Sequence, residues 1–218
     1  MQSETVIKKL DLLDRCMPVK TVVEYGGMWG VDNLYATECV KRWGVKKVLS
    51  IDFYESDNWK VQKRHYPQIT FIKGDFRNKD FMKKITKKYD LGICYDILLH
   101  QPECYETLEL MLSKIKTYFC FAQPVIEEKR VSFKNTMVFL PGSQEKFQLR
   151  PYLLNKDIKI FDINRVDPSH WIWAMTPTLI KNMLKSLRWK IIYEDAWQGW
   201  LPKISIWKMY RCIAKKEK

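Results

Sequence analysis

The segment from Thr21 to Asp52 constrains the fold most strongly, because it has the pattern of one βαβ unit with an acidic residue near the end of each strand. A β-branched run ends beside Glu24, a helix is predicted over Val31 to Trp43, and a second strand ends at Asp52. Three glycines follow the first strand: Gly26, Gly27 and Gly30. An acid about twenty or more residues after a glycine turn can accept hydrogen bonds from both ribose hydroxyls. The unit therefore predicts a nucleoside site above the sheet.

The residues between the glycines indicate which nucleoside cofactor fits. A dinucleotide fingerprint is GxGxxG, in which the second glycine lets the backbone approach a pyrophosphate. Here the sequence is GGMWG, with Met28 at the relevant position. Bulky Met28 and Trp29 suit a ligand without a pyrophosphate, so a nicotinamide oxidoreductase fits poorly.

With these residues the chain resembles the class I S-adenosylmethionine-dependent methyltransferases, whose first motif is an acid, any residue, and glycines ending at the position of Gly30. Later landmarks of that family follow in order over roughly residues 21–214. The resemblance implies an S-adenosylmethionine site made of Glu24, Gly26, Gly27, Gly30, Asp52, Phe53, Asp75, Phe76 and Asp96. It implies that Asp52 binds the ribose with Phe53 stacking near the adenine.

The resemblance also gives roles to the residues after the third and fourth strands. It places Asp75 at the adenine amino group, with Phe76 beside it. It places Asp96, within YDLGICYDILLHQP, in the loop below the methionine end of the cofactor.

Each landmark taken alone has a purely structural interpretation. The glycines could serve only as turns, and Asp52 could be a helix N-cap. Asp75 and Asp96 could be caps or turn formers. Their coincidence at the ends of four successive predicted strands favours the joint interpretation.

Alternating strands and helices predict an α/β fold with a mostly parallel sheet covered by helices on both faces. The resemblance specifies a Rossmann-like sheet of seven strands with a C-terminal antiparallel strand. We expect a single domain over residues 1–218, an N-terminal helix within residues 1–18, and an insertion over residues 127–173. The insertion has no sustained period, and long irregular segments are often functional, so we expect it to cap the site.

Composition narrows the class of protein. A chain of 218 residues with 46% hydrophobic content can bury one core, and it contains no apolar run long enough to predict a membrane span. Six cysteines without CxxC spacing indicate reduced thiols and a cytoplasmic setting. No metal site is predicted. The formal net charge of +13 makes RNA a candidate partner, although the lysines are scattered over most predicted helices.

Catalysis of methyl transfer requires alignment of a nucleophile with the cofactor methyl, and a base helps when the acceptor is a hydroxyl. His100, in the loop after the fourth strand, is the first candidate base and His170 is the second. The predicted function is methylation of a small molecule at an oxygen or nitrogen atom. An RNA-modifying methyltransferase and a non-catalytic S-adenosylmethionine-binding scaffold are the alternatives, the latter because Met28 stands where the family often has glycine.

Overall fold

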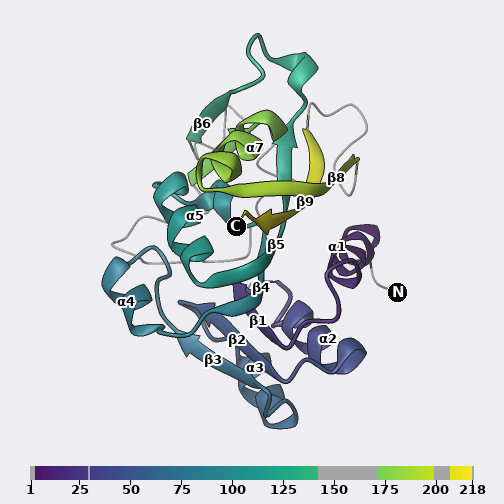
Figure 1. Cartoon of the computed structure of the whole chain (residues 1–218), viewed down its shortest axis with the longest axis vertical. Coiled ribbons are helices and arrows are strands. Elements are labelled where there is room, and N and C mark those ends of the chain that lie inside the picture. The colour runs from purple at the N-terminus through teal and green to yellow at the C-terminus, as the bar shows by residue number, and fades with distance from the viewer. Residues whose placement is uncertain (1–2, 29, 142–170, 199–206, 218) are drawn as a thin grey trace.

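The computed structural model describes residues 3–28, 30–141, 171–198 and 207–217 (Figure 1). Its main sheet has seven strands in the order β3-β2-β1-β4-β5-β9-β8. They are β1 Thr21–Tyr25, β2 Lys47–Asp52, β3 Ile69–Lys73, β4 Tyr89–Tyr95, β5 Ile115–Ile126, β8 Trp189–Trp197 and β9 Trp207–Lys216. Strands β1 to β5 are parallel, and β9 is antiparallel to both β5 and β8. The predicted fold class is confirmed.

Successive side chains of each strand point to opposite faces of the sheet, so both faces are apolar, and helices cover both of them. Val22 packs in the apolar cluster under one set of helices, whereas Val23 packs in the other cluster. The first set is α1 Glu4–Asp14, α2 Leu34–Trp43 and α3 Asp57–Gln62, and the second is α4 Lys79–Lys84, α5 Cys104–Ser113 and α7 Pro177–Ser186. In the described part of the chain, short 3-10 turns also connect elements: η1 Lys63–His65, η2 Leu98–His100 and η3 Glu128–Arg130.

The start of α2 differs from its prediction. A helix from Val31 was expected, but α2 begins at Leu34, because Asp32 and Asn33 have φ values of 46° and 60°. This left-handed backbone leaves a turn of residues 26–33 between β1 and α2, which is longer than a simple glycine turn.

The 127–173 insertion contains regular structure that its irregular sequence pattern did not reveal. Strands β6 Met137–Pro141 and β7 Trp171–Met175 pair antiparallel, with Pro141 opposite Trp171. Both strands are short apolar runs, too brief to show a clear period. The hairpin therefore leaves the sheet just after β5 and returns just before α7, as Figure 1 shows at the end where β6 and α7 lie. Thr176 caps α7: its side chain accepts from Leu179 N, and Pro177 stands at the start of the helix.

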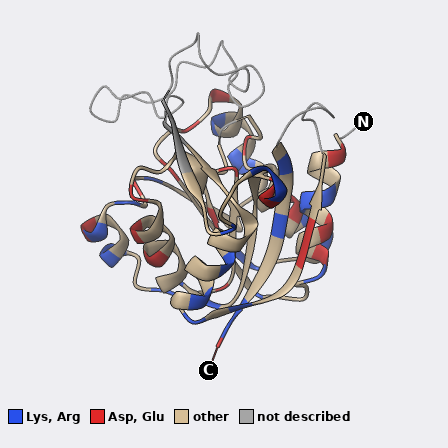
Figure 2. Ribbon diagram, turned by 90° about the horizontal axis from the view of Figure 1, so that it is seen from above, with Lys and Arg blue, Asp and Glu red and all other residues tan. Residues whose placement is uncertain are grey.

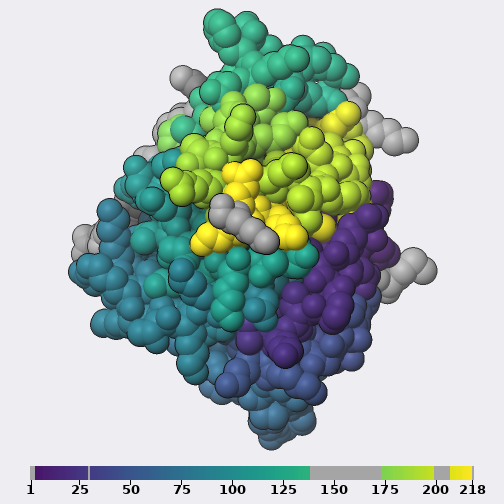
Figure 3. All heavy atoms as spheres, viewed as in Figure 1, coloured from purple at the N-terminus to yellow at the C-terminus, as the bar shows by residue number. Residues whose placement is uncertain are grey.

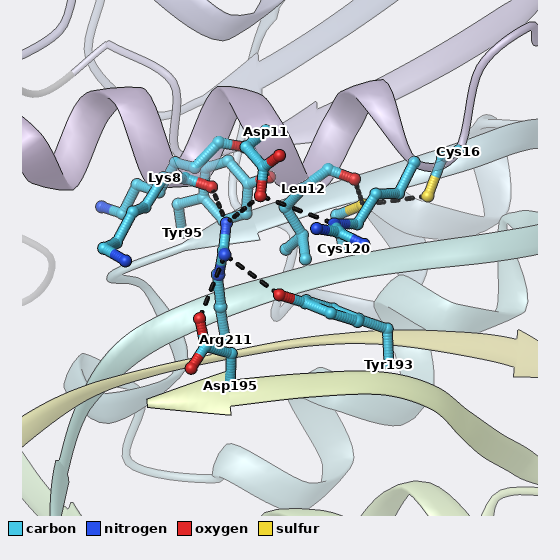
Figure 4. Close-up of polar contacts among 11 residues, drawn as sticks. Lys8, Asp11, Leu12, Cys16, Tyr95, Cys120, Tyr193, Asp195 and Arg211 are labelled. Carbon is cyan, nitrogen blue, oxygen red and sulfur yellow. Dashed lines mark hydrogen bonds and ion pairs between the residues drawn. The ribbon is translucent and has the colours of Figure 1, made fainter. Parts of the chain in front are cut away.

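Helix α1 is held against the far end of the chain by Arg211 of β9 (Figure 4). The Arg211 guanidinium is only 4% exposed. It donates to Asp11 Oδ2 at 2.8 Å and to the backbone oxygen of Lys8, both on α1. On the β8 side it donates to Asp195 Oδ2 and to the Tyr193 hydroxyl, each at 3.1 Å. In Figure 3 the purple N-terminal segment accordingly packs against the teal, green and yellow part of the molecule.

Two further expectations from the sequence concern reduced cysteines and the lack of a membrane-spanning segment. All six cysteines are buried and free of disulfides, and Cys16 Sγ at the end of α1 lies 3.4 Å from Cys120 Sγ. Among the described residues, no helix combines the length and the apolar character that a membrane crossing needs.

We predict that Arg211→Met lowers the free energy of unfolding by about 2 to 4 kcal/mol, because it leaves Asp11 and Asp195 without their shared cation in a partly buried place. The matched control is Arg15→Met: Arg15 also pairs with Asp11, at 3.5 Å, and stacks on Tyr193 at 4.2 Å, but its side chain is 46% exposed. That variant should lose less than about 1 kcal/mol. Urea unfolding of the two variants measures the difference, and equal losses would contradict the anchoring role of Arg211.

Candidate functional site

The turn after β1 is shaped by two glycines. Gly26 has a φ of 71°, and its amide donates to Ile51 O of β2 at 2.9 Å. A β-carbon at this position would lie 2.1 Å from the Ile97 side chain, so only glycine fits between β1 and the loop after β4. Gly27 is packed as closely, and its carbonyl accepts from Asn33 N at 2.6 Å.

Asn33 closes this turn from its other end. Its side chain is fully buried, and its Oδ1 accepts from Ser50 Oγ of β2 at 2.6 Å. The turn is thus tied to β2 at both ends, which fixes its backbone over the first two strand ends.

Asp52, at the end of β2, holds the middle of the same turn. Its Oδ2 accepts from Met28 N at 3.0 Å, and its Oδ1 accepts from Tyr54 N at 3.2 Å. The residue is 2% exposed. Burial raises the pKa of Asp52 to about 6, although these backbone donors act in the opposite direction. Each carboxylate oxygen keeps acceptor capacity for a hydroxyl. The alternative role as helix cap belongs instead to Ser56, which accepts from Trp59 N at the start of α3.

Glu24, one residue before the end of β1, is directed toward α2. Its Oε2 accepts from Ala36 N at 3.2 Å, and a β-carbon on Gly27 would lie 2.6 Å from its carboxyl carbon. Desolvation raises the pKa of Glu24 to about 8, and the nearby charge of Asp52 contributes to the increase. Glu24 is therefore mainly protonated at neutral pH, and its visible role is to connect β1 with α2. Its contact with a cofactor stays a prediction.

Asp96 follows β4 and faces a buried lysine. Lys9 of α1, with its side chain 5% exposed, forms an ion pair with Asp96 Oδ2. The Lys9 ammonium also lies 5.5 Å from the ring centre of Tyr95 and 5.9 Å from that of Tyr35. Among the described residues, the other carboxylate oxygen of Asp96 is buried without a hydrogen-bond partner. A buried acceptor of this kind has unused capacity for a donor.

The predicted site residues after β2 and β3 differ in their burial and in their contacts. Asp75 binds Arg77, whose Nη2 lies 2.8 Å from Asp75 Oδ2, so its carboxylate already has a cation. Phe76 is buried in the core, with its ring edge against Tyr25 at a centroid distance of 5.8 Å. Phe53 is half-buried. The predicted adenine contacts of Asp75, Phe76 and Phe53 stay predictions.

The candidate base His100 ends the η2 turn and is half-buried, whereas His170 lies outside the described residues. The β6–β7 hairpin docks on this turn, since Trp173 Nε1 donates to Gln101 O at 2.8 Å. Buried Gln123 of β5 supports it by accepting from Leu99 N at 3.1 Å. The end of the insertion, in β7, thus lies against the loop that carries His100.

The structure brings together at one edge of the sheet the ends of all four strands whose acids were predicted to form the site: Glu24, Asp52, Asp75 and Asp96. The sequence interpretation missed Lys9, Asn33, Ser50 and Gln123. A lysine between Thr5 and Leu13 on the apolar face of α1 was the one available signal. Among the described residues, no group of three His, Cys, Asp or Glu side chains could hold a metal ion.

No family model matches the chain, and no curated protein matches it at a significant level. Solved structures do resemble it. The 1,6-didemethyltoxoflavin-N1-methyltransferase of Burkholderia thailandensis, with S-adenosylhomocysteine bound, has a TM-score of 0.63 and 13% identity over 96% of this chain and 76% of that one. An O-methyltransferase family protein from the same organism has a TM-score of 0.61 and 12% identity over 98% of this chain, which spans 55% of that protein.

A third structure is the magnesium protoporphyrin IX methyltransferase from Synechocystis PCC 6803 with bound S-adenosylhomocysteine. Its TM-score is 0.56, with 16% identity over 98% of this chain and 81% of that one. At these identities the likeness establishes the fold. The chain has the class I methyltransferase fold, as its motifs predicted.

We predict that Glu24→Gln becomes more stable relative to the parent as the pH rises from about 4.5 to 8. An acid whose pKa is higher in the folded state binds more protons there, so it costs the parent stability as pH rises through this window. The gain at pH 8 relative to pH 4.5 is at most about 5 kcal/mol, from a rise of about 3.5 pKa units. Glutamine keeps the acceptor for Ala36 N. Urea unfolding of both proteins across this pH range tests it, and a constant difference would show that Glu24 is not protonated in the native state.

Proposed function

We propose that this chain is an S-adenosylmethionine-dependent methyltransferase that acts on an oxygen or nitrogen atom of a small molecule. One observation carries the proposal: the Asp52 carboxylate reaches the Met28 amide, so the acid predicted to bind ribose lies directly beside the turn after β1. A nucleoside lying across the ends of β1 and β2 would meet both. The fold shared with methyltransferase structures supports this assignment.

The charge at this edge suits a cationic cofactor. We count charged residues within two positions of the strand ends at the edge where β1 to β5 finish. The acids that contribute negative charge are Asp52, Asp75, Asp96, Glu127, Glu128 and Asp195, against the bases Lys73 and Lys208; Glu24 also lies here but is mainly protonated. S-adenosylmethionine has a sulfonium and an ammonium against one carboxylate, so its net positive charge is favoured here.

Lys9 and Asp96 fit the amino-acid end of the cofactor. Together they offer a cation and an anion, with an additional buried acceptor on Asp96 Oδ1. Opposite charges in this order are complementary to an α-carboxylate and an α-ammonium.

The same turn is unsuited to a dinucleotide. Pyrophosphate binding needs a helix N-terminus at the glycine turn, whereas α2 starts only at Leu34. Met28 N already donates to Asp52. The Met28 side chain is buried in the apolar cluster beneath α1 and α2.

Bound S-adenosylmethionine supplies an electrophilic methyl group, and the protein supplies position and proton acceptance. We assign the acceptor side to the η2 turn, with His100 as the first candidate base and His170 as the second. The 127–173 segment caps this side, as the contact between Trp173 and Gln101 supports. The similar structures include enzymes named for a toxoflavin precursor and a porphyrin, which supports a small-molecule acceptor. Six free cysteines fit a reducing compartment, so we propose a cytoplasmic location.

We predict that S-adenosylmethionine and S-adenosylhomocysteine bind, that NAD does not, and that Asp52→Ala weakens binding by about 1.5 to 3 kcal/mol through the loss of charge-assisted hydrogen bonds. Asp57→Ala, which removes an exposed acid at the start of α3, is the control and should bind normally. Isothermal titration gives all five results. Tight NAD binding without a response to S-adenosylmethionine would end the methyltransferase assignment.

We predict that residues 142–170 decide acceptor choice. Because Pro141 and Trp171 are opposite each other in the hairpin, a short glycine-containing loop can join them without disturbing β6 or β7. The shortened protein should bind S-adenosylhomocysteine as the parent does but lose methyl transfer. Labelled S-adenosylmethionine and fractionated cell extract provide the assay, with label counted in small metabolites and in RNA. Transfer retained by the shortened protein would place acceptor recognition elsewhere, and label in RNA would favour the RNA-modifying alternative.

A further inference from the structure

The edge of the sheet opposite the candidate site has the reverse charge. At this opposite edge β1 to β5 and β8 begin and β9 ends, and the charged residues considered are again those within two positions of a strand end. The described bases there are Lys20, Lys46, Lys47, Lys87, Lys88, Lys114, Lys116, Arg188, Lys190, Lys215 and Lys216, and the acids are Asp90 and Glu217. We call these eleven bases the amino rim. Its excess of nine positive charges is most of the formal net charge of +13.

Backbone contacts show that the amino rim is continuous. Lys46 N and Lys47 N both lie within 3.4 Å of Lys20 O, which joins the starts of β2 and β1. Tyr89 N donates to Lys114 O at 2.8 Å, which joins β4 and β5. At the other end Lys215 is opposite both Tyr118 of β5 and Lys190 of β8. Figure 2 shows blue segments at the edge from which the C-terminus leaves.

The charge of the amino rim is largely uncompensated. Its members are exposed apart from half-buried Lys114. Among the described residues, Lys116 is the one rim base with a carboxylate within ion-pair distance, Asp90 Oδ1 at 3.4 Å. Like charges this close repel one another, and a bound polyanion relieves that repulsion.

We propose that the amino rim binds the phosphate backbone of a single-stranded nucleic acid. The six strands that carry rim bases, β2-β1-β4-β5-β9-β8, lie about 4.8 Å apart and extend over roughly 24 Å, which exceeds the size of a single phosphate group and matches a run of them. Ten of the eleven bases are lysines, which contact phosphate as point charges and do not read base edges in the bidentate way of arginine. Binding is therefore independent of sequence.

The shape of the rim favours a flexible strand over a membrane. Neighbouring strands of a sheet rotate by about 20 to 25°, so the two ends of this six-stranded rim differ in direction by about 100 to 125°. A planar bilayer meets only part of such a line, whereas a single strand can follow it. None of the exposed large apolar side chains, which could enter a bilayer, belongs to the described rim; Ile192 of β8 lies two positions after Lys190, just outside it.

The test compares two triple variants that remove equal charge. The rim triple is Lys46→Gln, Lys87→Gln and Lys190→Gln. The control triple is Lys60→Gln, Lys79→Gln and Lys134→Gln, all exposed and away from the rim. The probes are fluorescent oligouridylate and oligodeoxythymidylate of about 20 nucleotides, longer than the roughly 4 to 16 nucleotides that one binding groove contacts. Anisotropy titrations at several salt concentrations give affinity and salt dependence.

The parent should bind, and the rim triple should bind about 10- to 100-fold more weakly at 0.1 M salt, with a slope of log affinity against log salt that is smaller by about 2. The control triple should match the parent. Equal affinities for the two oligonucleotides would indicate that the phosphate backbone common to RNA and DNA is the ligand. A preference for one of them would identify RNA or DNA as the partner.

Three results would overturn the proposal: no binding by the parent, equal loss in both triples, or rim-dependent binding to phosphatidylserine vesicles in the absence of oligonucleotide binding. Titration of the rim triple with S-adenosylhomocysteine checks its folding. Because that ligand belongs to the opposite edge, failure of the rim proposal and failure of the proposed function give different results.

Discussion

Burial of both faces of the sheet confines charged side chains of its parallel strands to the strand ends. Because β1 to β5 run in one direction, each edge of the sheet collects the residues from one type of end. Acids such as Asp52 and Asp96 gather where the strands finish, and lysines such as Lys47 and Lys88 gather where they start. The fold thus separates an acidic edge, where we propose the cofactor site, from a strongly basic edge. Strand direction, rather than a local motif, produces both surfaces.

The cofactor edge also depends on contacts between the two ends of the chain. Arg211 on β9 holds α1 through Asp11, and α1 in turn brings Lys9 to Asp96. A buried guanidinium with several acceptors gives this contact a defined geometry. The position of the Lys9 ammonium is therefore set by a residue of the last strand, about two hundred positions away along the chain.

Much of the fold and some of the site could be predicted from the sequence, for identifiable reasons. Repeated strand–helix units and the acid and glycine pattern around Glu24 depend on local spacing, and local spacing is visible in one sequence. The start of α2 at Leu34 could not be predicted in this way, because it depends on the hydrogen bond between Asn33 and Ser50, which belong to different elements. Lys9 and Arg211 were missed for the same reason: each looks like a surface charge until its partner on a distant element is known.

The distance between the two edges of the sheet decides whether a nucleic acid bound at the amino rim can also be the methyl acceptor. Lys88 and Asp96 flank the seven residues of β4, so about 26 Å of extended chain separates them. A nucleic acid bound along the amino rim would therefore not present a base to the methyl group at the opposite edge. The high positive charge, which first makes RNA a candidate substrate, argues for an anchoring partner instead. The proposed function places acceptor selection at the acidic edge, where the described charges attract cations and repel a phosphate backbone.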